Sequence, residues 1–198
     1  MMKLSRILRL PGGVVTHLLW RVGLSRPPDR KLLEDVIFAR YRNREAFPRV
    51  LICGVARYSA HYPALFANQE VMSLDRDPDS ARYGAERHLT DTIQNLGQYV
   101  APGYFDVILM NGLIGYGVND RKSAETAVAV CHRHLREGGE LLLSTDEGRP
   151  FHGQLSQVTT LQEGFTELDF PSLGPSAESV VPWRIHSTHV FHFYRKKG

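Results

Sequence analysis

Residues 50–58, Val-Leu-Ile-Cys-Gly-Val-Ala-Arg-Tyr, decide how the rest of the sequence is interpreted. The first four are apolar and include two β-branched side chains, which is typical of a buried strand. Gly54 then begins a turn, because glycine adopts backbone conformations that other residues avoid. A buried strand followed by such a turn is where an α/β sheet commonly meets a nucleotide-like ligand. The stretch therefore predicts a strand and a ligand-binding loop, although it holds a single glycine.

Strand-like and helix-like segments alternate through the rest of the chain. The segments RVLICGV, EVMSLD, YFDVILMNGLI and ELLLST are predicted strands, AHYPALFA is a predicted short helix, and another helix is predicted to begin at Pro78. A longer helix is expected over 121–136, before Gly138 and Gly139. Its apolar face comprises Ala124, Ala127, Val128, Cys131 and Leu135. FTELDF and HVFHFYRK are predicted to form a final strand pair. This alternation predicts βαβ units and an α/β fold with a mostly parallel sheet.

The N-terminal part differs in charge from the remainder. Residues 1–50 contain 11 Lys and Arg against 4 Asp and Glu, a balance of +7, whereas the remainder carries −4. After a break at Ser-Arg-Pro-Pro, a helix is predicted over 30–47. Its inner face is expected to consist of Leu32, Leu33, Val36 and Ile37. We expect an N-terminal helical extension over 1–48 and one Rossmann-like domain over 49–198.

The composition indicates a soluble globular protein, with 42% hydrophobic and 23% charged residues among 198. Cys53 and Cys131 fall in apolar segments, so we expect buried free thiols and a cytoplasmic location. The nine histidines lack zinc-site spacing, and His189 and His192 should face opposite sides of a strand. No metal site is therefore predicted. The acidic balance after residue 50 argues against nucleic acid as a partner.

The first residues leave several interpretations open. The apolar run VVTHLLW is too short to cross a bilayer, and no small-residue cleavage site follows it. A possible helical face holds Leu4, Ile7 and Leu8, beside Lys3, Arg6 and Arg9. Such a helix can cap the core, bind peripherally to a membrane surface, or contact a polyanion or a protein partner. Membrane-peripheral placement through this basic segment is thus an alternative to a purely cytoplasmic protein.

Candidate ligand residues follow the predicted strands, because ligands of an open parallel sheet bind at the carboxyl ends of its strands. Asp75 ends the second strand, and its carboxylate can accept hydrogen bonds from both hydroxyls of a ribose. It lies 21 residues after Gly54, close to the spacing of about 20 between a nucleotide turn and its ribose acid. An N-cap of the next helix is the alternative role for an acid at this position.

The order of these segments resembles the class I S-adenosylmethionine-dependent methyltransferases over about residues 49–197. In that family a phrase like FDVIL begins the fourth strand, as at 105–109 here. A helix ending in Leu-(Lys/Arg)-Pro-Gly-Gly-x-Leu precedes the fifth strand, and LREGGEL stands at 135–141. The chain is similar to a bacterial group of methyltransferase-domain proteins. The resemblance implies a doubly wound, mostly parallel seven-stranded sheet, with S-adenosylmethionine as the cofactor.

Residue by residue, the resemblance implies that Gly54 is the first glycine of the cofactor loop, Asp75 the ribose acid and Asp91 the acid beside the adenine. The other cofactor-side residues that it implies are Val55, Ala56, Tyr58, Arg76, Thr92, Asn111 and Gly112. The family usually has an acid two positions before the first glycine, where this chain has Ile52, and two further glycines, where it has Ala56 and Tyr58. The chain therefore departs from the family at the methionine end of the cofactor.

Methyl transfer depends mainly on holding the acceptor atom in line with the methyl group, and it needs a base only when the acceptor must lose a proton. Candidate bases near the strand ends are Tyr116, Asp146 and His152, each of which has a structural alternative. We expect a methyltransferase that acts on a hydroxyl of a small-molecule or glycan-type acceptor.

The sequence leaves two alternative functions to consider. The departures at the cofactor loop are compatible with an inactive methyltransferase-fold protein that acts as a binding or scaffolding subunit. A nicotinamide-dependent dehydrogenase is disfavoured, because the chain lacks Gly-x-Gly-x-x-Gly after its first strand.

Overall fold

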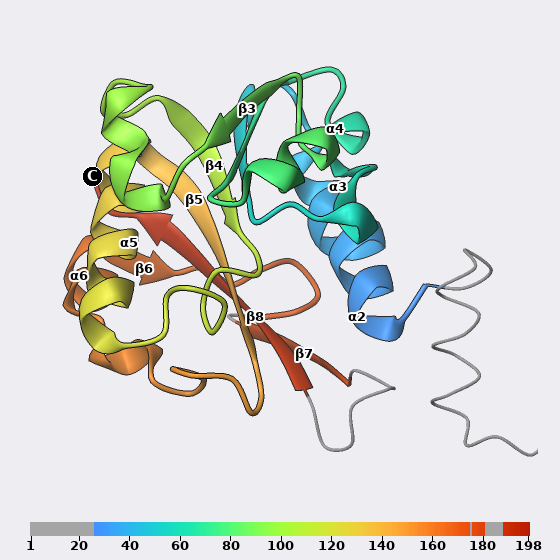
Figure 1. Cartoon of the computed structure of the whole chain (residues 1–198). Helices are drawn as coiled ribbons and strands as arrows, with labels where there is room; N and C mark the ends of the chain where they lie inside the picture. Colours follow the sequence, from blue (N-terminus) through green and yellow to red (C-terminus); the bar gives the residue numbers. More distant parts are fainter. Residues whose placement is uncertain (1–25, 175, 181–187) are drawn as a thin grey trace, which may run out of the picture.

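A mostly parallel sheet with helices on both faces forms the centre of the protein (Figure 1). The computed structural model describes residues 26–174, 176–180 and 188–198. The predictions for the basic segment before residue 26 therefore lie outside the described residues. No helix within the described ranges is long and apolar enough to cross a membrane.

The strands are β1 (Arg49–Cys53), β2 (Glu70–Asp75), β3 (Arg87–Thr90), β4 (Phe105–Met110), β5 (Leu135–Asp146), β6 (Phe165–Glu167), β7 (Ser176–Val180) and β8 (Thr188–Lys196). They follow the order β3-β2-β1-β4-β5-β8-β6, in which the first five are mutually parallel and β8 is antiparallel to β5. The predicted α/β class and the final strand pair, β6 with β8, are confirmed.

The number of strands differs from the predicted seven, because the described sheet has eight. β6 pairs with β8 at 194–196, whereas β7 pairs with it at 188–192. Two short strands thus lie end to end along the edge of β8 that β5 leaves open. The sequence between them contains two prolines and a glycine, which indicate a loop and give no sign of the strand that follows.

Helix α5 (Arg121–His134) covers one face of the sheet. Asp120 caps its first turn by accepting a hydrogen bond from the Ser123 backbone N–H. Four of the five predicted inner residues lie in this helix and are fully buried: Ala124, Ala127, Val128 and Cys131. The helix ends two residues earlier than predicted, because Leu135 is already extended and begins β5. Cys53 and Cys131 are both buried and free, as expected.

The opposite face is covered by a helical segment from the N-terminal part, built of α2 (Pro28–Lys31), a π-helical stretch (Leu32–Ile37) and α3 (Phe38–Tyr41). The prediction of a helix to residue 47 was wrong at its end, since the helix stops at Tyr41. The expected inner face was also partly wrong, because Val36 is 38% exposed. A π-helical turn contains more residues than an α-helical turn, which rotates Val36 outward and brings Phe38 and Tyr41 onto the buried side.

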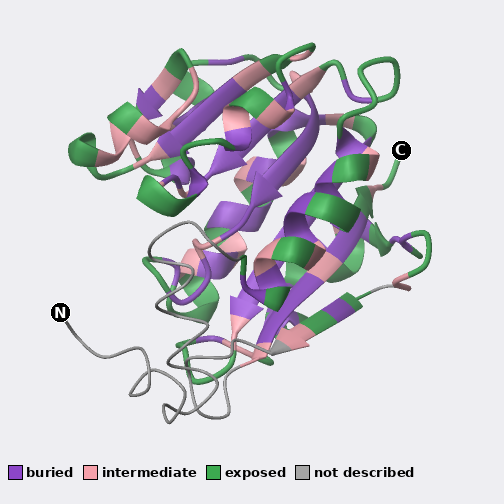
Figure 2. Ribbon diagram, turned by 90° about the vertical axis from the view of Figure 1, so that its right-hand side faces the viewer, coloured by how far each residue is buried: buried purple, intermediate pink, exposed green. Residues whose placement is uncertain are grey.

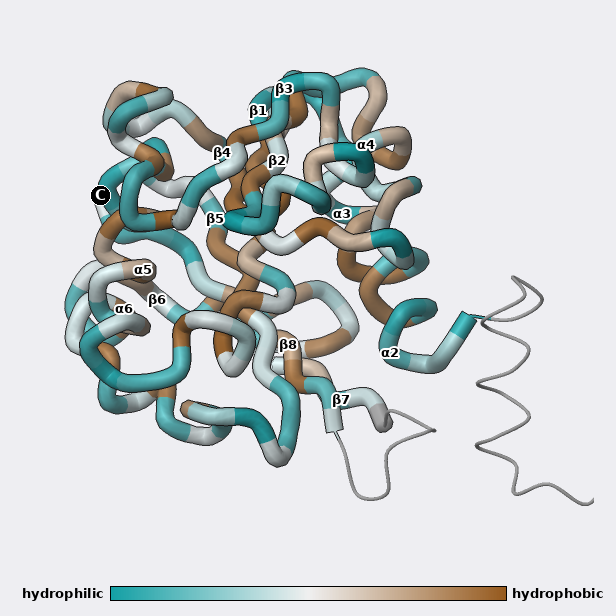
Figure 3. Tube along the Cα trace, viewed as in Figure 1, coloured by the Kyte–Doolittle hydropathy of each residue, from teal (hydrophilic) through white to brown (hydrophobic). Residues whose placement is uncertain are grey.

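The remaining helices are short: α4 (Tyr62–Leu65), α6 (Thr159–Gly164) and 3-10 helices at Arg57–Ser59, Pro78–Tyr83, Ile93–Gln98 and Leu155–Gln157. The helix predicted from Pro78 is thus a single 3-10 segment. Figure 2 shows the buried residues along the central strands and on the sheet-facing sides of the helices. Figure 3 shows hydrophobic segments inside and hydrophilic ones in the outer loops. All six residues of β4 are buried, as expected for a strand covered on both faces.

Candidate functional site

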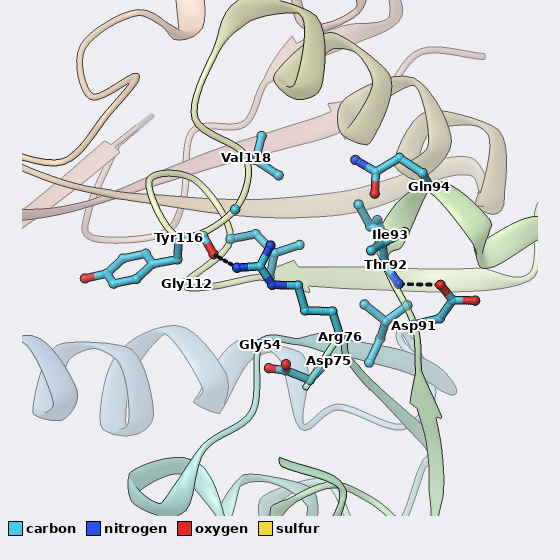
Figure 4. A pocket seen from close by; sticks show the side chains of 13 residues that line it. Gly54, Asp75, Arg76, Asp91, Thr92, Ile93, Gln94, Gly112, Tyr116 and Val118 are labelled. Carbon is cyan, nitrogen blue, oxygen red and sulfur yellow. Dashed lines mark hydrogen bonds between the residues drawn. The ribbon is translucent and has the colours of Figure 1, made fainter. Parts of the chain in front are cut away.

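A pocket lies at the carboxyl ends of the parallel strands, next to the point where the strand order reverses beside β1 (Figure 4). It holds about 480 Å³ of empty space, part of which is open to solvent. Its walls come from the ends of β1 and β2 and from the loops after β3 and β4. The lining residues are Gly54, Leu74, Asp75, Arg76, Asp91, Thr92, Ile93, Gln94, Gly112, Leu113, Tyr116, Gly117 and Val118. Six of the ten predicted cofactor-side residues are among them.

Gly54 brings the loops after β1 and β4 into close contact. Its φ of +78° lies in the left-handed region, and its N–H donates to the Leu74 carbonyl at 2.9 Å. A Cβ atom at this position would lie only 2.6 Å from the Asn111 carbonyl oxygen. Both the conformation and the space therefore require glycine here.

Asp75 is held with its carboxylate at the pocket wall. Oδ2 accepts a hydrogen bond from the Val55 N–H at 3.0 Å, and Oδ1 accepts one from the Asp77 N–H at 2.9 Å. A carboxylate has about four acceptor positions, so two such bonds leave room for further donors. The alternative N-cap role belongs to Asp77, which accepts from the Asp79 N–H and precedes Pro78.

Asp91 lies at the pocket rim, but its carboxylate is engaged locally. It accepts hydrogen bonds from Asn95 Nδ2 (2.8 Å), the Thr92 N–H (2.7 Å) and the Tyr99 hydroxyl (2.8 Å). These bonds lower the pKa of the carboxyl below its usual value, with the Asn95 bond contributing most. Figure 4 shows the carboxylate turned away from Arg76. Asp91 therefore fixes the turn that presents Thr92 and its neighbours to the pocket.

Arg76 crosses the pocket from the end of β2 to the loop after β4 (Figure 4). One of its guanidinium nitrogens, Nη2, lies 3.4 Å from the Tyr116 carbonyl oxygen. A Cβ atom on Gly117 would lie 3.1 Å from Arg76 Nη1, so the absence of a side chain there makes room for the guanidinium.

The other four predicted cofactor-side residues lie outside the pocket lining. The Val55 N–H is bound to Asp75, and the Ala56 N–H donates to Ser59 Oγ at 2.9 Å. The buried Asn111 side chain accepts from Ser144 Oγ at 2.8 Å, so it supports the loop rather than facing the pocket.

Tyr58, the fourth of these residues, stands over the loop after β4. Its hydroxyl oxygen lies 4.0 Å from the position of a Cβ atom on Gly112, and its ring is 39% exposed. The ring also contacts Arg30, whose Cζ atom lies 4.3 Å from the ring centroid. The bulky residue in the degenerate loop therefore forms a wall beside the end of β4.

The three candidate bases separate into a pair and a single residue. The Tyr116 hydroxyl donates a hydrogen bond to Asp146 Oδ2, and Tyr116 also lines the pocket. Arg149 Cζ lies 4.4 Å from the centroid of the Tyr116 ring. His152 is placed elsewhere, with its Nδ1 atom 3.2 Å from Thr145 Oγ1. Tyr116 is thus the candidate base that lines the pocket, and Asp146 is its hydrogen-bond partner.

Two residues behind this pair were not predicted as site residues. His189 is opposite Asp146 in the β5–β8 register, and its Nδ1 lies 3.9 Å from Asp146 Oδ1. Asp29, in α2, places Oδ2 3.4 Å from the same nitrogen. His189 shares a strand face with Phe191 and Phe193, an alternation that could have indicated its burial; the prediction that His189 and His192 face opposite sides is confirmed. Nothing in the sequence indicates that Asp29 would reach β8.

The whole fold is similar to those of solved structures that span most of this chain. No family model matches the sequence, and no curated protein matches it. Among solved structures, the chain is similar to the N-methyltransferase NodS of Bradyrhizobium japonicum in complex with S-adenosylhomocysteine, with TM-score 0.62, 16% identity, and coverage of 90% of this chain and 92% of that one.

Further structural matches have the same kind of fold. A TehB-like S-adenosylmethionine-dependent methyltransferase of Corynebacterium glutamicum has TM-score 0.62 and 19% identity, with coverage of 91% and 94%. The 16S rRNA methyltransferase RsmC of T. thermophilus has TM-score 0.50 and 16% identity, with 76% of this chain covering 35% of that one. These similarities establish the fold. One of the matched proteins is named as an N-methyltransferase and another as an rRNA methyltransferase.

Proposed function

We propose that this chain, which has the fold of the class I S-adenosylmethionine-dependent methyltransferases, is such an enzyme and methylates a hydroxyl of a small-molecule or glycan-type acceptor. The observation that carries the proposal is that Gly54 and Asp75 lie together at the point where the strand order reverses. Gly54 makes the close approach of the loops after β1 and β4 possible. Asp75 offers an oriented carboxylate with acceptor positions available for further hydrogen bonds.

The residues of the pocket fit the nucleoside half of S-adenosylmethionine. Asp75 would accept hydrogen bonds from the ribose hydroxyls. The buried Ile93 and Val118, with Leu113, offer apolar surface to an adenine ring, and Arg76 offers a planar cation beside it. The cofactor supplies a methyl group on a positively charged sulfur, a good leaving group.

The Tyr116–Asp146 pair supports a hydroxyl as the acceptor. A hydroxyl must lose its proton when it is methylated, and a carboxylate that already accepts a hydrogen bond from the pocket-lining Tyr116 can receive a proton through that phenol. The acidic balance after residue 50 supports an uncharged or small acceptor over nucleic acid.

The test begins with the cofactor. Calorimetric titration of the wild-type protein with S-adenosylhomocysteine should show binding, and Asp75→Asn should weaken it about 10- to 100-fold, because hydrogen bonds to a charged group contribute about 1.5–3 kcal/mol. Asp79→Asn, a nearby exposed acid outside the pocket lining, is the control and should bind as the wild type does. Absence of binding at millimolar ligand would overturn the proposal and favour a scaffolding subunit.

The acceptor class is tested next, by transfer of a labelled methyl group from S-adenosylmethionine to a panel of sugars, phenols, alcohols and amines. Labelling confined to amines would contradict a hydroxyl acceptor. Peripheral membrane contact through the basic N-terminal segment stays a prediction. Flotation with anionic liposomes tests it, with the full chain compared to a chain that begins at Pro28. Equal flotation would contradict that contact.

A further inference from the structure

Four side chains from four parts of the chain lie in a row at the carboxyl end of β5. Tyr116 comes from the loop after β4, Asp146 from the end of β5, His189 from β8 and Asp29 from α2. The Tyr116 hydroxyl bonds to Asp146 Oδ2, Asp146 Oδ1 lies 3.9 Å from His189 Nδ1, and that nitrogen lies 3.4 Å from Asp29 Oδ2. The row thus runs from the pocket wall into the protein interior.

The inner half of the row is buried. Asp29 is 3% exposed and His189 is 6% exposed. Moving a carboxylate out of water costs several kcal/mol unless opposite charge and hydrogen bonds compensate. The compensation for Asp29 comes from His189 and from Arg30, whose Nε lies 3.6 Å from Asp29 Oδ2. Within the described residues, the other oxygen, Oδ1, has no hydrogen-bond partner.

Stabilising the first turn of α2 does not explain this placement. An acid in a first turn interacts favourably with the helix dipole while exposed to water, so that role requires neither burial nor an imidazole. The sheet register independently sets His189 beside Asp146, since the two are directly paired between β5 and β8. Helix and sheet therefore converge on one imidazole nitrogen, placed between two carboxylates.

From this geometry we infer that Asp29 and His189 are positioning residues for the Tyr116–Asp146 pair, and that the four side chains together receive the proton of the acceptor hydroxyl. The inference rests on the proposed function and deepens it. We place the His189 proton on Nδ1, because carboxylate oxygens face that atom from two sides. The N–H is hydrogen-bonded to Asp29 Oδ2, and at 3.9 Å it acts on Asp146 Oδ1 through its electrostatic field. Asp146 Oδ2 remains directed at the hydroxyl of Tyr116, a residue of the pocket lining whose ring points away from Arg76 (Figure 4).

The proton transfer balances without any further reactant. As the acceptor oxygen forms its bond to the methyl carbon, its O–H bond breaks and its proton passes to Tyr116 Oη, while the phenol's own proton passes to Asp146. The electron pair of the broken C–S bond stays on sulfur. The array then holds one additional proton, which it releases to solvent. Because Asp29 lies on α2, the N-terminal helical segment contributes the innermost member of this row of side chains.

The test measures how far Asp146 accepts the proton of Tyr116, through the ¹³Cζ resonance of the Tyr116 ring in protein labelled at tyrosine Cζ. The chain has eight tyrosines, and Tyr116→Phe identifies the signal. Asp29→Asn leaves Asp146 as the one carboxylate facing the imidazole N–H. That makes Asp146 a weaker acceptor, so the Tyr116 signal should move away from the phenolate value.

His189→Gln should have the opposite effect, because it removes the imidazole donor from Asp146 and makes its carboxylate a stronger acceptor. The Tyr116 signal should then move toward the phenolate value. Tyr104, whose hydroxyl donates to Glu70 at the other end of the sheet, is an internal control and should not shift in either variant.

Opposite shifts at Tyr116 with no shift at Tyr104 support the inference. An unchanged Tyr116 signal, shifts in the same direction, or equal shifts at Tyr104 would overturn it. Far-UV circular dichroism checks that each variant folds, and either variant alone still tests the direction of its own shift. Failure of the proposed function is separate, because it appears as absence of S-adenosylhomocysteine binding by the wild-type protein.

Discussion

Replacing Gly54 by alanine tests the structural basis of the pocket most directly. The substitution places a methyl group at a φ of +78°, a left-handed conformation that costs a residue with a side chain about 1–2 kcal/mol. The new Cβ atom would stand 2.6 Å from the Asn111 carbonyl oxygen, where ordinary contacts begin at 3.4 Å. The loops after β1 and β4 must therefore separate.

Separating these loops costs free energy, because the contact at Gly54 is with a backbone carbonyl oxygen, which cannot turn aside as a flexible side chain can. Gly54 is anchored by its hydrogen bond to the Leu74 carbonyl, and Asn111 by the bond between its side chain and Ser144. Overpacking of a tight site costs about 1–3 kcal/mol. With the conformational cost, Gly54→Ala should lower the free energy of unfolding by about 2–5 kcal/mol. The displaced loops should also weaken S-adenosylhomocysteine binding about tenfold or more, since each tenfold corresponds to about 1.4 kcal/mol.

Gly103→Ala is the matched control. Gly103 has a similar φ of +71°, lies before β4 at the opposite end of the sheet, and a Cβ atom there would approach nothing closer than 3.9 Å. It should show the conformational cost of about 1–2 kcal/mol alone, with unchanged ligand affinity. Urea unfolding followed by circular dichroism and calorimetric titration measure the two effects. Equal destabilisation by the two substitutions would refute the argument from the close approach of the loops.

Three further predictions concern single side chains. Arg76→Ala should weaken S-adenosylhomocysteine binding about tenfold, because the guanidinium crosses the pocket. The free energy of unfolding should change by no more than about 0.5 kcal/mol, because Arg76 is exposed. Unchanged affinity in calorimetry would contradict this role. Burial raises the pKa of Cys131 to about 12 and that of Cys53 well above its usual value, so neither thiol should react with a disulfide reagent at pH 8 until urea unfolds the protein. Fast labelling of the folded protein would contradict this. Burial, together with the nearby His152, lowers the pKa of His192 to about 4, whereas in an unfolded chain it is near 6.5. The unfolded state therefore binds the proton more readily, and the free energy of unfolding should fall as the pH decreases from about 6.5 to 4. His192→Asn should reduce that loss by up to about 3 kcal/mol, and an unchanged pH profile of unfolding would be evidence against the shift.

The central strands and the place of the pocket could be predicted from local patterns in the sequence. β1 and β4 stand out as apolar runs, because a strand covered on both faces must be apolar at almost every position. Gly54 and Asp75 could be found because each follows directly from its strand end, so their positions depend on local chain geometry and on the parallel arrangement of neighbouring strands. These signals are local, and they survived into the structure unchanged.

Other features were decided only by tertiary structure. Val36 turned outward because of a π-helical turn, and Asn111 turned to Ser144 instead of the pocket. The Asp91 carboxylate accepts hydrogen bonds from three donors of its own turn, which the family resemblance does not reveal. Each outcome depends on which side chains compete for one polar group or one patch of apolar surface.

The contact between Asp29 and His189 joins residues 160 positions apart, and it exists only because α2 packs against β7, the strand that pairs with β8 at His189. Sequence pattern reports what each residue prefers within a few neighbours along the chain. It carries no information about which distant carboxylate a buried imidazole will meet, because sheet order and register determine that. The nucleoside side of the pocket was therefore predictable from the sequence, whereas the array beside Tyr116 required the folded chain.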